Sequence, residues 1–423
     1  MSETNPRVLL VSASPLDAAT GTGTTLRALF SEWPRQNLAQ IHYDPLGSEP
    51  TVRCYQHSMA GGNWFLRAAS KARRRASTAG STSRPVVDVS VPLSRRTWES
   101  TARRWCSAGL DLLGGGTSPE LLGFAEDFRP DVIYTLLGSA SVTRTAMGLQ
   151  DSLGVPLVVH FMDDWLSTRY ANGEWGGLAD RALQTMVRAA VTSPGGSLAI
   201  SPQMAEEYGR RFRRDFGVAG NYVSDEQFGE PRDGSEESLS LVYLGGLHLG
   251  RGETLIKLAD ALVRSASGIL RVFAPERDLA AYPRLSDHPA VVETRNASAG
   301  EMPGILAKSD MAVHVESFDE ETCRFTRLSL STKIPMYMAA GRPILAVCRE
   351  DLASGQYVER SGCGIRCDAS PDALARTLAT LSDPAVRRQM SLVGLDVARS
   401  RHSQASTTMA LLEAFGWVQT TDK

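Results

Sequence analysis

Long apolar runs are missing from this sequence of 423 residues, and their absence limits where the chain can act. No run approaches the ~18 consecutive apolar residues that a membrane-spanning helix needs. The start, MSETNPRVLLVSASP, lacks a charged segment followed by a long apolar one, so no secretory signal is expected. We therefore expect a cytoplasmic protein.

Cysteine is also scarce, which argues against a disulfide framework or a structural zinc site. Cys363 and Cys367 are close in sequence, but zinc needs four ligands and no second pair lies nearby. We expect reduced thiols and no bound metal. The six cysteines are Cys54, Cys106, Cys323, Cys348, Cys363 and Cys367.

Two familiar phosphate-binding motifs are absent near the start of the chain. The apolar run Arg7–Ala13 predicts a strand, and Gly21–Thr25 (GTGTT) predicts a glycine-rich loop before a helix over Leu26–Trp33. This loop lacks the third glycine of a dinucleotide fingerprint and the lysine of a P-loop. It is either a ligand-facing loop or an ordinary tight turn.

Charge is nearly balanced over the whole chain, with a formal net charge of −2, but one segment is strongly basic. Between Arg67 and Arg104 there are ten basic residues and two acidic ones, with Trp64 and Trp105 close to its ends. Basic residues with interfacial aromatics suit an anionic membrane surface. The alternative is a solvated insertion, and no motif of an RNA-binding module is present.

The length exceeds what one hydrophobic core usually supports, so two domains are expected. Within the first, Asp127–Leu137 predicts a helix end followed by a buried strand, and Val155–Phe161 predicts a second strand. The helix Val142–Leu153 joins the two strands into a βαβ unit. The polar residues of HFMDDW follow the second strand, where sheets of this kind bind ligands. A carboxylate there could act as a base on a hydroxyl or could cap the next helix.

The most informative stretch is residues 309–347, which predicts strand, acidic loop, short helix and strand. Ser331 and Thr332 offer hydroxyls at the start of the helix, and Gly341 followed by Pro343 ends it. Lys333 lies in its first turn, where an ammonium and the helix dipole would both attract a phosphate group. The alternative is a solvated surface lysine.

A second glycine-rich segment opens the C-terminal half. The run Leu239–Leu244 predicts a strand, and GGLHLGRG (residues 245–252) precedes a clear helix. Glycines let the backbone approach a ligand, and Arg251 can bind a phosphate group through two parallel hydrogen bonds.

The string STKIPMYMAAGRPILA, preceded by HVESFDEE and by the distant YLGGLHLGRGETL, resembles the nucleotide-sugar half of GT-B glycosyltransferases, especially family 4 and its relatives in polysaccharide clusters. The family pattern of Lys, Tyr, Ala, Gly and Pro is met by Lys333, Tyr337, Ala339, Gly341 and Pro343. The resemblance spans nearly the whole chain. It implies an α/β fold with two facing Rossmann-like domains, a central cleft and a C-terminal crossover helix.

The resemblance also implies a domain order. Residues 1–221 would form the acceptor-binding domain, residues 222–238 a linker, residues 239–402 the nucleotide-sugar domain, and residues 403–423 a helix returning to the first domain.

The activity that the resemblance implies is transfer of a sugar from a nucleoside diphosphate sugar to a hydroxyl acceptor. The donor would be a UDP-sugar in preference to a GDP- or dTDP-sugar, and the acceptor a glycan, a lipid-linked glycan or a small natural product. No cofactor, metal or nucleic acid is expected. Retention of configuration is typical of family 4, but a base at Asp163 or Asp164 would permit inversion.

The expected site residues follow from the same positions. The catalytic set is Arg251, Lys333, Asp163 and Asp164. The donor-binding set is Gly245, Gly246, Arg251, Glu316, Ser317, Glu320, Glu321, Ser331, Thr332 and Lys333. The acceptor set is Gly21, Thr22, Gly23, His160 and Asp163.

One position departs from the family pattern. The family usually carries an acid just before the tyrosine, where it holds donor hydroxyls, and this sequence has Met336. Another acid would then be needed to hold the ribose, and Glu316, Asp319, Glu320 and Glu321 are the nearest in sequence. Two alternatives to a transferase are a sugar-nucleotide epimerase of the same fold and a non-catalytic donor-binding scaffold.

Overall fold

The computed structural model describes residues 5–17, 21–47, 49–58, 98–232 and 238–417. The chain divides into two compact units. The first comprises residues 1–219 and 408–423, and the second comprises residues 220–407. Most of the segment Gly61–Arg104, which was predicted to contact membranes, lies outside the described residues, namely its residues 61–97.

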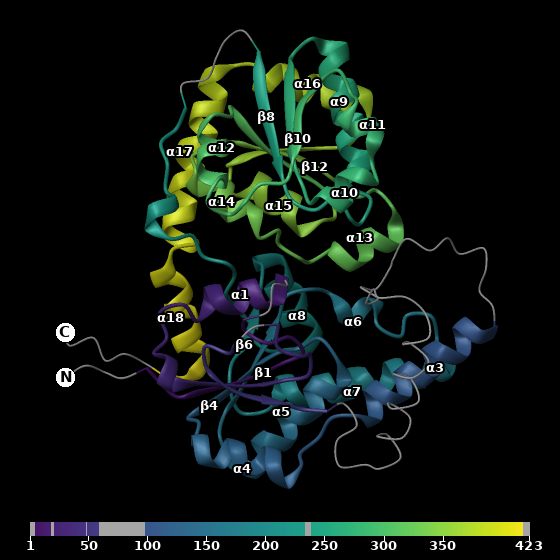
Figure 1. Cartoon of the computed structure of the whole chain (residues 1–423), viewed down its shortest axis with the longest axis vertical. Helices are drawn as coiled ribbons and strands as arrows, with labels where there is room; N and C mark the ends of the chain where they lie inside the picture. The colour runs from purple at the N-terminus through teal and green to yellow at the C-terminus, as the bar shows by residue number, and fades with distance from the viewer. Residues whose placement is uncertain (1–4, 18–20, 48, 59–97, 233–237, 418–423) are drawn as a thin grey trace. The chain divides into compact units, whose positions relative to one another are not determined.

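The first unit is built on a seven-stranded parallel sheet (Figure 1). The four strands at its centre are buried along their whole length, as expected for parallel strands covered on both faces. In spatial order the strands are β3 (Arg53–Gln56), β2 (Leu38–His42), β1 (Val8–Ser12), β4 (Val132–Leu136), β5 (Leu157–Phe161), β6 (Ser197–Ala199) and β7 (Gly217–Val218).

Helices connect these strands and cover the sheet. They are α1 (Gly21–Leu29), α3 (Trp98–Leu113), α4 (Pro119–Phe128), α5 (Ala140–Leu153), α6 (Trp165–Thr168), α7 (Leu178–Thr192) and α8 (Pro202–Phe212). Far along the chain, α18 (Gln404–Phe415) contributes Leu411, Leu412 and Phe415 to the same core, where Phe415 contacts the ring of Trp33 edge-on.

The second unit is built on a six-stranded parallel sheet. In spatial order its strands are β10 (Val291–Arg295), β9 (Gly268–Phe273), β8 (Leu239–Leu244), β11 (Met311–Val315), β12 (Ile344–Val347) and β13 (Gly364–Cys367). Its helices are α9 (Arg251–Ser265), α10 (Glu276–Ala280), α11 (Pro283–Ser286), α12 (Met302–Ala307), α13 (Glu320–Thr326), α14 (Lys333–Ala339), α15 (Ala353–Arg360), α16 (Pro371–Leu381) and α17 (Pro384–Arg401).

The prediction of an α/β fold with two parallel sheets and alternating helices is confirmed. The predicted strand Ile344–Val347 and the left-handed Gly341 that ends the preceding helix are both found, the latter with φ +66°.

One prediction was wrong. The segment Gly21–Thr25 is the start of helix α1 and not a loop, because two glycines in the first turn of a helix cost little when the following residues pack into the core.

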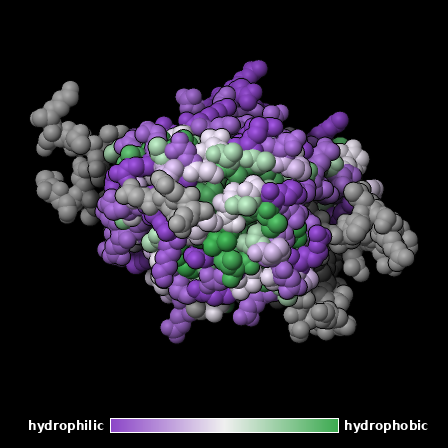
Figure 2. Space-filling model, turned by 90° about the horizontal axis from the view of Figure 1, so that it is seen from above, coloured by the Kyte–Doolittle hydropathy of each residue, from purple (hydrophilic) through white to green (hydrophobic). Residues whose placement is uncertain are grey.

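No helix among the described residues is long and apolar enough to cross a membrane. The face in Figure 2 carries hydrophobic residues bordered by hydrophilic ones. In the described part of the second unit, the exposed large hydrophobic side chains are Val263, Val292 and Leu392. Single exposed hydrophobic residues are normal on a folded surface.

Candidate functional site

The topology of the second sheet marks one place for a ligand. The connection from β8 leads to β9 on one side, and the connection from β11 leads to β12 on the other. In sheets of this kind ligands bind beyond the carboxyl ends of the strands at the point where the direction of winding reverses. Here that point lies beyond Leu244 and Val315, so residues 245–251 and 316–319 border it.

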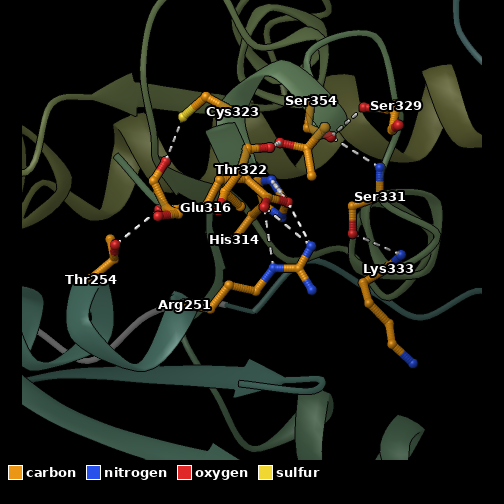
Figure 3. A network of polar contacts seen from close by, with 12 residues as sticks. Arg251, Thr254, His314, Glu316, Thr322, Cys323, Ser329, Ser331, Lys333 and Ser354 are labelled. Atoms are coloured by element: carbon orange, nitrogen blue, oxygen red, sulfur yellow. Dashed lines mark hydrogen bonds and ion pairs between the residues drawn. The ribbon is translucent and has the colours of Figure 1, made fainter. Parts of the chain in front are cut away.

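Arg251 and Glu316 form an ion pair with three hydrogen bonds at this point (Figure 3). Nε and Nη2 of Arg251 donate to the carboxylate of Glu316 at 3.0 to 3.2 Å. The side chains are 19% and 5% exposed. Burial lowers the pKa of the guanidinium, but the Glu316 carboxylate, with smaller contributions from Tyr243 and Tyr337, raises it above its ordinary value, so Arg251 stays charged. Two predicted donor-site residues are thus bound to each other.

The glycine-rich loop before Arg251 is held in one conformation. Gly250 has φ +72°, and a Cβ atom added there would lie 2.9 Å from Oγ of Ser317. A side chain at Gly246 would lie 2.4 Å from Nδ1 of His248. The hydroxyl of Tyr243 donates to the Gly246 carbonyl at 2.7 Å. The loop therefore needs these glycines to bring Arg251 next to the end of β11.

Helix α14 is attached to the end of β8 by a buried tyrosine. The Tyr337 hydroxyl accepts from the Leu244 amide at 3.2 Å and donates to the Leu244 carbonyl at 3.1 Å. Lys333 begins the same helix one turn earlier. Lys333 therefore lies beside the carboxyl end of β8. Tyr337 attaches the helix to that strand end, and the helix runs from there toward the amino end of β12.

Lys333 lies half-buried, and desolvation lowers the pKa of its ammonium. Within the described part of the chain no carboxylate forms an ion pair with it, and Figure 3 shows the side chain extended away from the network around Arg251. A partly desolvated cation without a carboxylate partner is suited to an anionic ligand. Of the two hydroxyls before the helix, Ser331 Oγ accepts from the Lys333 amide at 3.4 Å, whereas Thr332 is exposed and does not cap the helix.

The remaining predicted donor residues lie in the loop after β11. Ser317 is buried, and its hydroxyl accepts from the Asp319 amide at 3.0 Å. Asp319 caps α13 by accepting from the Thr322 amide at 2.9 Å, and this bond lowers the pKa of its carboxyl. Glu320 and Glu321 are exposed in the first turn of that helix. The four acids of the loop therefore have three different environments.

His314 was not singled out from the sequence, although it shares a face of β11 with Glu316. It is 4% exposed, and its Nε2 lies 3.5 Å from Oε1 of Glu316. Desolvation lowers the pKa of His314 to about 4, so the imidazole is neutral at pH 7. The signal available in the sequence was the two-residue spacing of His and Glu at the end of a buried strand.

The predicted acceptor residues of the first unit fall in different environments. Asp163 is exposed, whereas Asp164 is fully buried, accepts from the Tyr208 hydroxyl at 2.9 Å and lies 3.7 Å from Arg211. Solvent therefore reaches Asp163, whereas the adjacent Asp164 is packed inside the unit. Gly21, Thr22 and Gly23 begin α1.

His160 is fully buried in the core of the first unit, with Nδ1 2.6 Å from the Tyr134 hydroxyl. Burial lowers its pKa to about 3, so it is neutral at pH 7. A direct contact of this imidazole with an acceptor is not supported by its surroundings, because the side chain is fully buried.

One buried carboxylate of the first unit, Asp111, was not predicted from the sequence, and it contacts residues that follow α6. Asp111 of α3 accepts from the Ser141 amide at 3.1 Å, from Arg169 Nη2 at 2.5 Å and from the Tyr170 hydroxyl at 2.7 Å. Arg169 and Tyr170 also line a pocket of about 510 Å³. This contact could not be predicted from a local sequence pattern, because Asp111 and Arg169 are 58 positions apart.

A pocket of about 760 Å³ in the second unit contains none of the predicted site residues. It lies beyond β12 and β13 and is lined by Arg349, Glu350, Asp351, Arg366, Cys367, Asp368, Ala373, Arg376 and Thr377. Among the described residues no cluster of three or more His, Cys, Asp or Glu side chains could hold a metal ion.

Comparison with known proteins agrees with the α/β fold. The sequence model of the glycosyl transferase 4-like domain matches residues 21–216. Comparison with curated protein sequences finds no match.

Solved structures that resemble the chain include HepE from Anabaena in complex with UDP, with a TM-score of 0.63 and 12% identity, covering 97% of this chain and 100% of that one. Sucrose-phosphate synthase from Thermosynechococcus elongatus has a TM-score of 0.62 and 14% identity, with 97% and 98% covered. WaaG, a glycosyltransferase involved in lipopolysaccharide biosynthesis, has a TM-score of 0.55 and 12% identity, with 97% and 100% covered.

Identities this low report a shared fold, whereas the family match rests on the sequence itself. The chain therefore has the GT-B fold seen in glycosyltransferases, and its residues 21–216 match the sequence model of the glycosyl transferase 4-like domain.

Proposed function

We propose that the protein transfers a sugar from a nucleoside diphosphate sugar to a hydroxyl acceptor, and that the second unit binds the donor. The observation that carries the proposal is the placement of two cations, Arg251 and Lys333, beside the carboxyl end of β8, where the sheet changes its winding direction. The similar HepE structures contain UDP and UDP-glucose, which supports a UDP-sugar as the donor.

In this mechanism the two cations stabilise the leaving group. Cleavage of the bond between the sugar and the diphosphate develops negative charge on the phosphate oxygens, and fixed cations at that place lower the barrier. Lys333 supplies this charge, and Arg251, whose charge is largely offset by Glu316, supplies directed hydrogen bonds, so we propose a reaction that needs no metal ion. Retention of configuration is the proposed outcome, following the family resemblance.

The first unit would bind the acceptor, which we propose to be a glycan, a lipid-linked glycan or a small natural product. Asp163 is exposed beyond β5 and could accept a hydrogen bond from an acceptor hydroxyl or act as a base. Asp164 and His160 would stabilise the strand end beneath it, since both are fully buried. Gly21, Thr22 and Gly23 at the start of α1 remain acceptor-site proposals.

The activity can be tested on free sugar nucleotides. Purified protein is incubated with UDP-, GDP- and dTDP-sugars, and the products are separated by chromatography. A transferase slowly hydrolyses its donor in the absence of an acceptor, so release of UDP from a UDP-sugar is expected. Formation of a different sugar nucleotide would indicate an epimerase instead.

A non-catalytic donor-binding scaffold is the second candidate, and Met336 is the observation that favours it. Its side chain is partly exposed on α14, and a thioether cannot accept the hydrogen bonds that a carboxylate would accept from donor hydroxyls. A scaffold would bind the donor and leave it intact in the same incubation.

We also propose that the basic segment Gly61–Arg104, whose residues 61–97 lie outside the described ones, contacts anionic membranes that carry a lipid-linked acceptor. Polybasic attraction weakens as salt screens the charges. Sedimentation with anionic vesicles should therefore be strong at low salt and weak at high salt, while neutral vesicles serve as the control. Absence of binding at low salt would favour an acceptor free in solution.

A further inference from the structure

The Arg251 guanidinium has two edges, and only one of them is occupied. Its Nε and Nη2 atoms donate to Glu316, whereas no residue that the structure describes accepts from Nη1. Figure 3 shows the dashed lines that join the guanidinium to the Glu316 carboxylate. The ion pair therefore fixes the plane of the guanidinium and leaves one pair of N–H donors for a ligand.

Glu316 is itself held from three sides. Its amide donates to the Val347 carbonyl at 3.2 Å, and its carbonyl accepts from the Thr254 hydroxyl at 2.8 Å. Its carboxylate lies 3.5 Å from the buried His314 ring. Strand β12 and helix α9 thus fix the backbone of Glu316, so its carboxylate is a rigid anchor for a long and otherwise mobile arginine side chain.

The Arg251–Glu316 ion pair makes Arg251 and Lys333 differ in how strongly they attract an anion. A carboxylate 3.0 Å from Arg251 cancels most of the attraction that its charge would exert at a distance. Lys333 has no such partner among the described residues. Attraction of an anion therefore comes mainly from Lys333, whereas Arg251 contributes directed hydrogen bonds.

We propose that Glu316 is a positioning residue, which holds Arg251 with its Nη1 edge turned toward the donor diphosphate and does not itself bind a sugar or ribose hydroxyl. This inference rests on the proposed function, because it assumes that a nucleoside diphosphate occupies the site. Glu316, which the sequence suggested as a ligand of donor hydroxyls, thereby has a different role. The carboxylate is satisfied by Arg251 and is 95% buried, so it presents little surface to a ligand.

A double-mutant cycle distinguishes a Glu316 that positions Arg251 from a Glu316 that contacts the nucleotide directly. UDP is titrated into wild type, Glu316→Gln, Arg251→Ala and the double variant, and dissociation constants are measured calorimetrically. If Glu316 acts through Arg251, Glu316→Gln weakens UDP binding ~10-fold in the wild-type background and less than ~2-fold when Arg251 is already Ala. Glu316→Asp, which keeps the carboxylate, should lose less affinity than Glu316→Gln.

Equal losses in both backgrounds would overturn the inference, because Glu316 would then contact the nucleotide directly. Tighter binding by Glu316→Gln would also overturn it, because the carboxylate would then compete with the diphosphate. Lys333→Ala should weaken binding whether or not Glu316 is changed, so it tests the donor site independently. Failure of the wild type to bind any nucleoside diphosphate would remove the proposed function and this inference with it.

A second variant covers the case in which Glu316→Gln does not fold. Thr254→Val removes the hydroxyl that fixes the Glu316 carbonyl and changes no charge. It should weaken UDP binding ~3-fold in the wild-type background and not at all in the Arg251→Ala background. An unchanged affinity in the wild-type background would count against the inference. Thermal unfolding of each variant checks that the chain is folded.

Discussion

At the scale of single residues, the donor site depends on which charges are already satisfied. Arg251 and Glu316 neutralise each other, Asp319 caps a helix, and Lys333 is the partly desolvated cation of the site. These differences follow from burial and hydrogen bonding. They distinguish residues that look equivalent in a sequence, where an acidic loop presents four carboxylates with the same formal charge.

Met336 provides a residue-scale prediction. It lies three positions after Lys333 on α14, so the two side chains share a face of the helix. Met336→Glu should bind UDP as tightly as wild type or up to ~10-fold tighter, because a carboxylate there can accept hydrogen bonds from ribose hydroxyls. Calorimetric titration measures this, with Met336→Gln as the uncharged control.

A clear loss of affinity in Met336→Glu but not in Met336→Gln would mean that the carboxylate repels the diphosphate. In that case Met336 would lie beside the phosphates and not beside the ribose.

At the scale of elements, the attachment of α14 to β8 sets the place of Lys333. Tyr337→Phe removes the hydroxyl that satisfies the buried amide of Leu244. The free energy of unfolding should fall by about 1–3 kcal/mol, the usual cost of leaving a buried group without its partner. Urea denaturation measures the change. Tyr55→Phe, at a partly exposed position, is the matched control and should stay within about 0.5 kcal/mol of wild type.

The loop before α9 gives a second prediction at this scale. Gly250→Ala places a Cβ atom 2.9 Å from Ser317 Oγ at a residue with φ +72°. It should destabilise the protein by about 1–2 kcal/mol and also weaken UDP binding, because the start of α9 carries Arg251. Gly304→Ala in α12 meets nothing within 4 Å and should be neutral or slightly stabilising. Identical melting curves for the two variants would contradict this account of the loop.

Several elements could be predicted from the sequence because local patterns determine them. The stretch from Ser331 to Pro343 carries hydroxyls, a lysine, a left-handed glycine and a proline at positions that mark a short helix. The glycine-rich segment before Arg251 was visible for the same reason. By contrast, Gly21–Thr25 suggested a loop, because the packing that makes it helical comes from residues elsewhere in the core.

The contacts within the candidate site could not be predicted, because they join residues distant in sequence. Arg251 and Glu316 are 65 positions apart, and only the adjacency of β8 and β11 brings them together. The difference between Asp163 and Asp164 depends on Tyr208, 44 positions beyond Asp164. Both facts follow from the order of strands, which single-sequence patterns do not determine.

At the scale of the whole molecule, buried histidines predict how stability depends on pH. Desolvation lowers the pKa of His160 to about 3, and of His314 and His402 to about 4, from an ordinary value of 6.5. Below pH 6.5 the unfolded chain binds protons at these rings and the native chain does not. Stability is therefore full above pH 6.5 and falls as the pH decreases toward 4.

His402→Gln tests this dependence at one site. Between pH 7 and pH 5 the wild type should lose about 2 kcal/mol more unfolding free energy than the variant, the amount that one such histidine contributes. Urea denaturation at both pH values gives the difference. Equal losses would mean that His402 is protonated in the native protein at pH 5.

The central claim is that the edge of the second sheet bearing Arg251 and Lys333 binds the diphosphate of a sugar nucleotide. Its most direct test is calorimetric titration of UDP into wild type, Arg251→Ala, Lys333→Ala and the surface control Lys308→Ala. We expect each of the first two variants to lose about 1.5–3 kcal/mol of binding free energy, as for charge-assisted hydrogen bonds, and the control to match wild type. Wild-type affinity in both Arg251→Ala and Lys333→Ala would contradict the account and place the donor elsewhere.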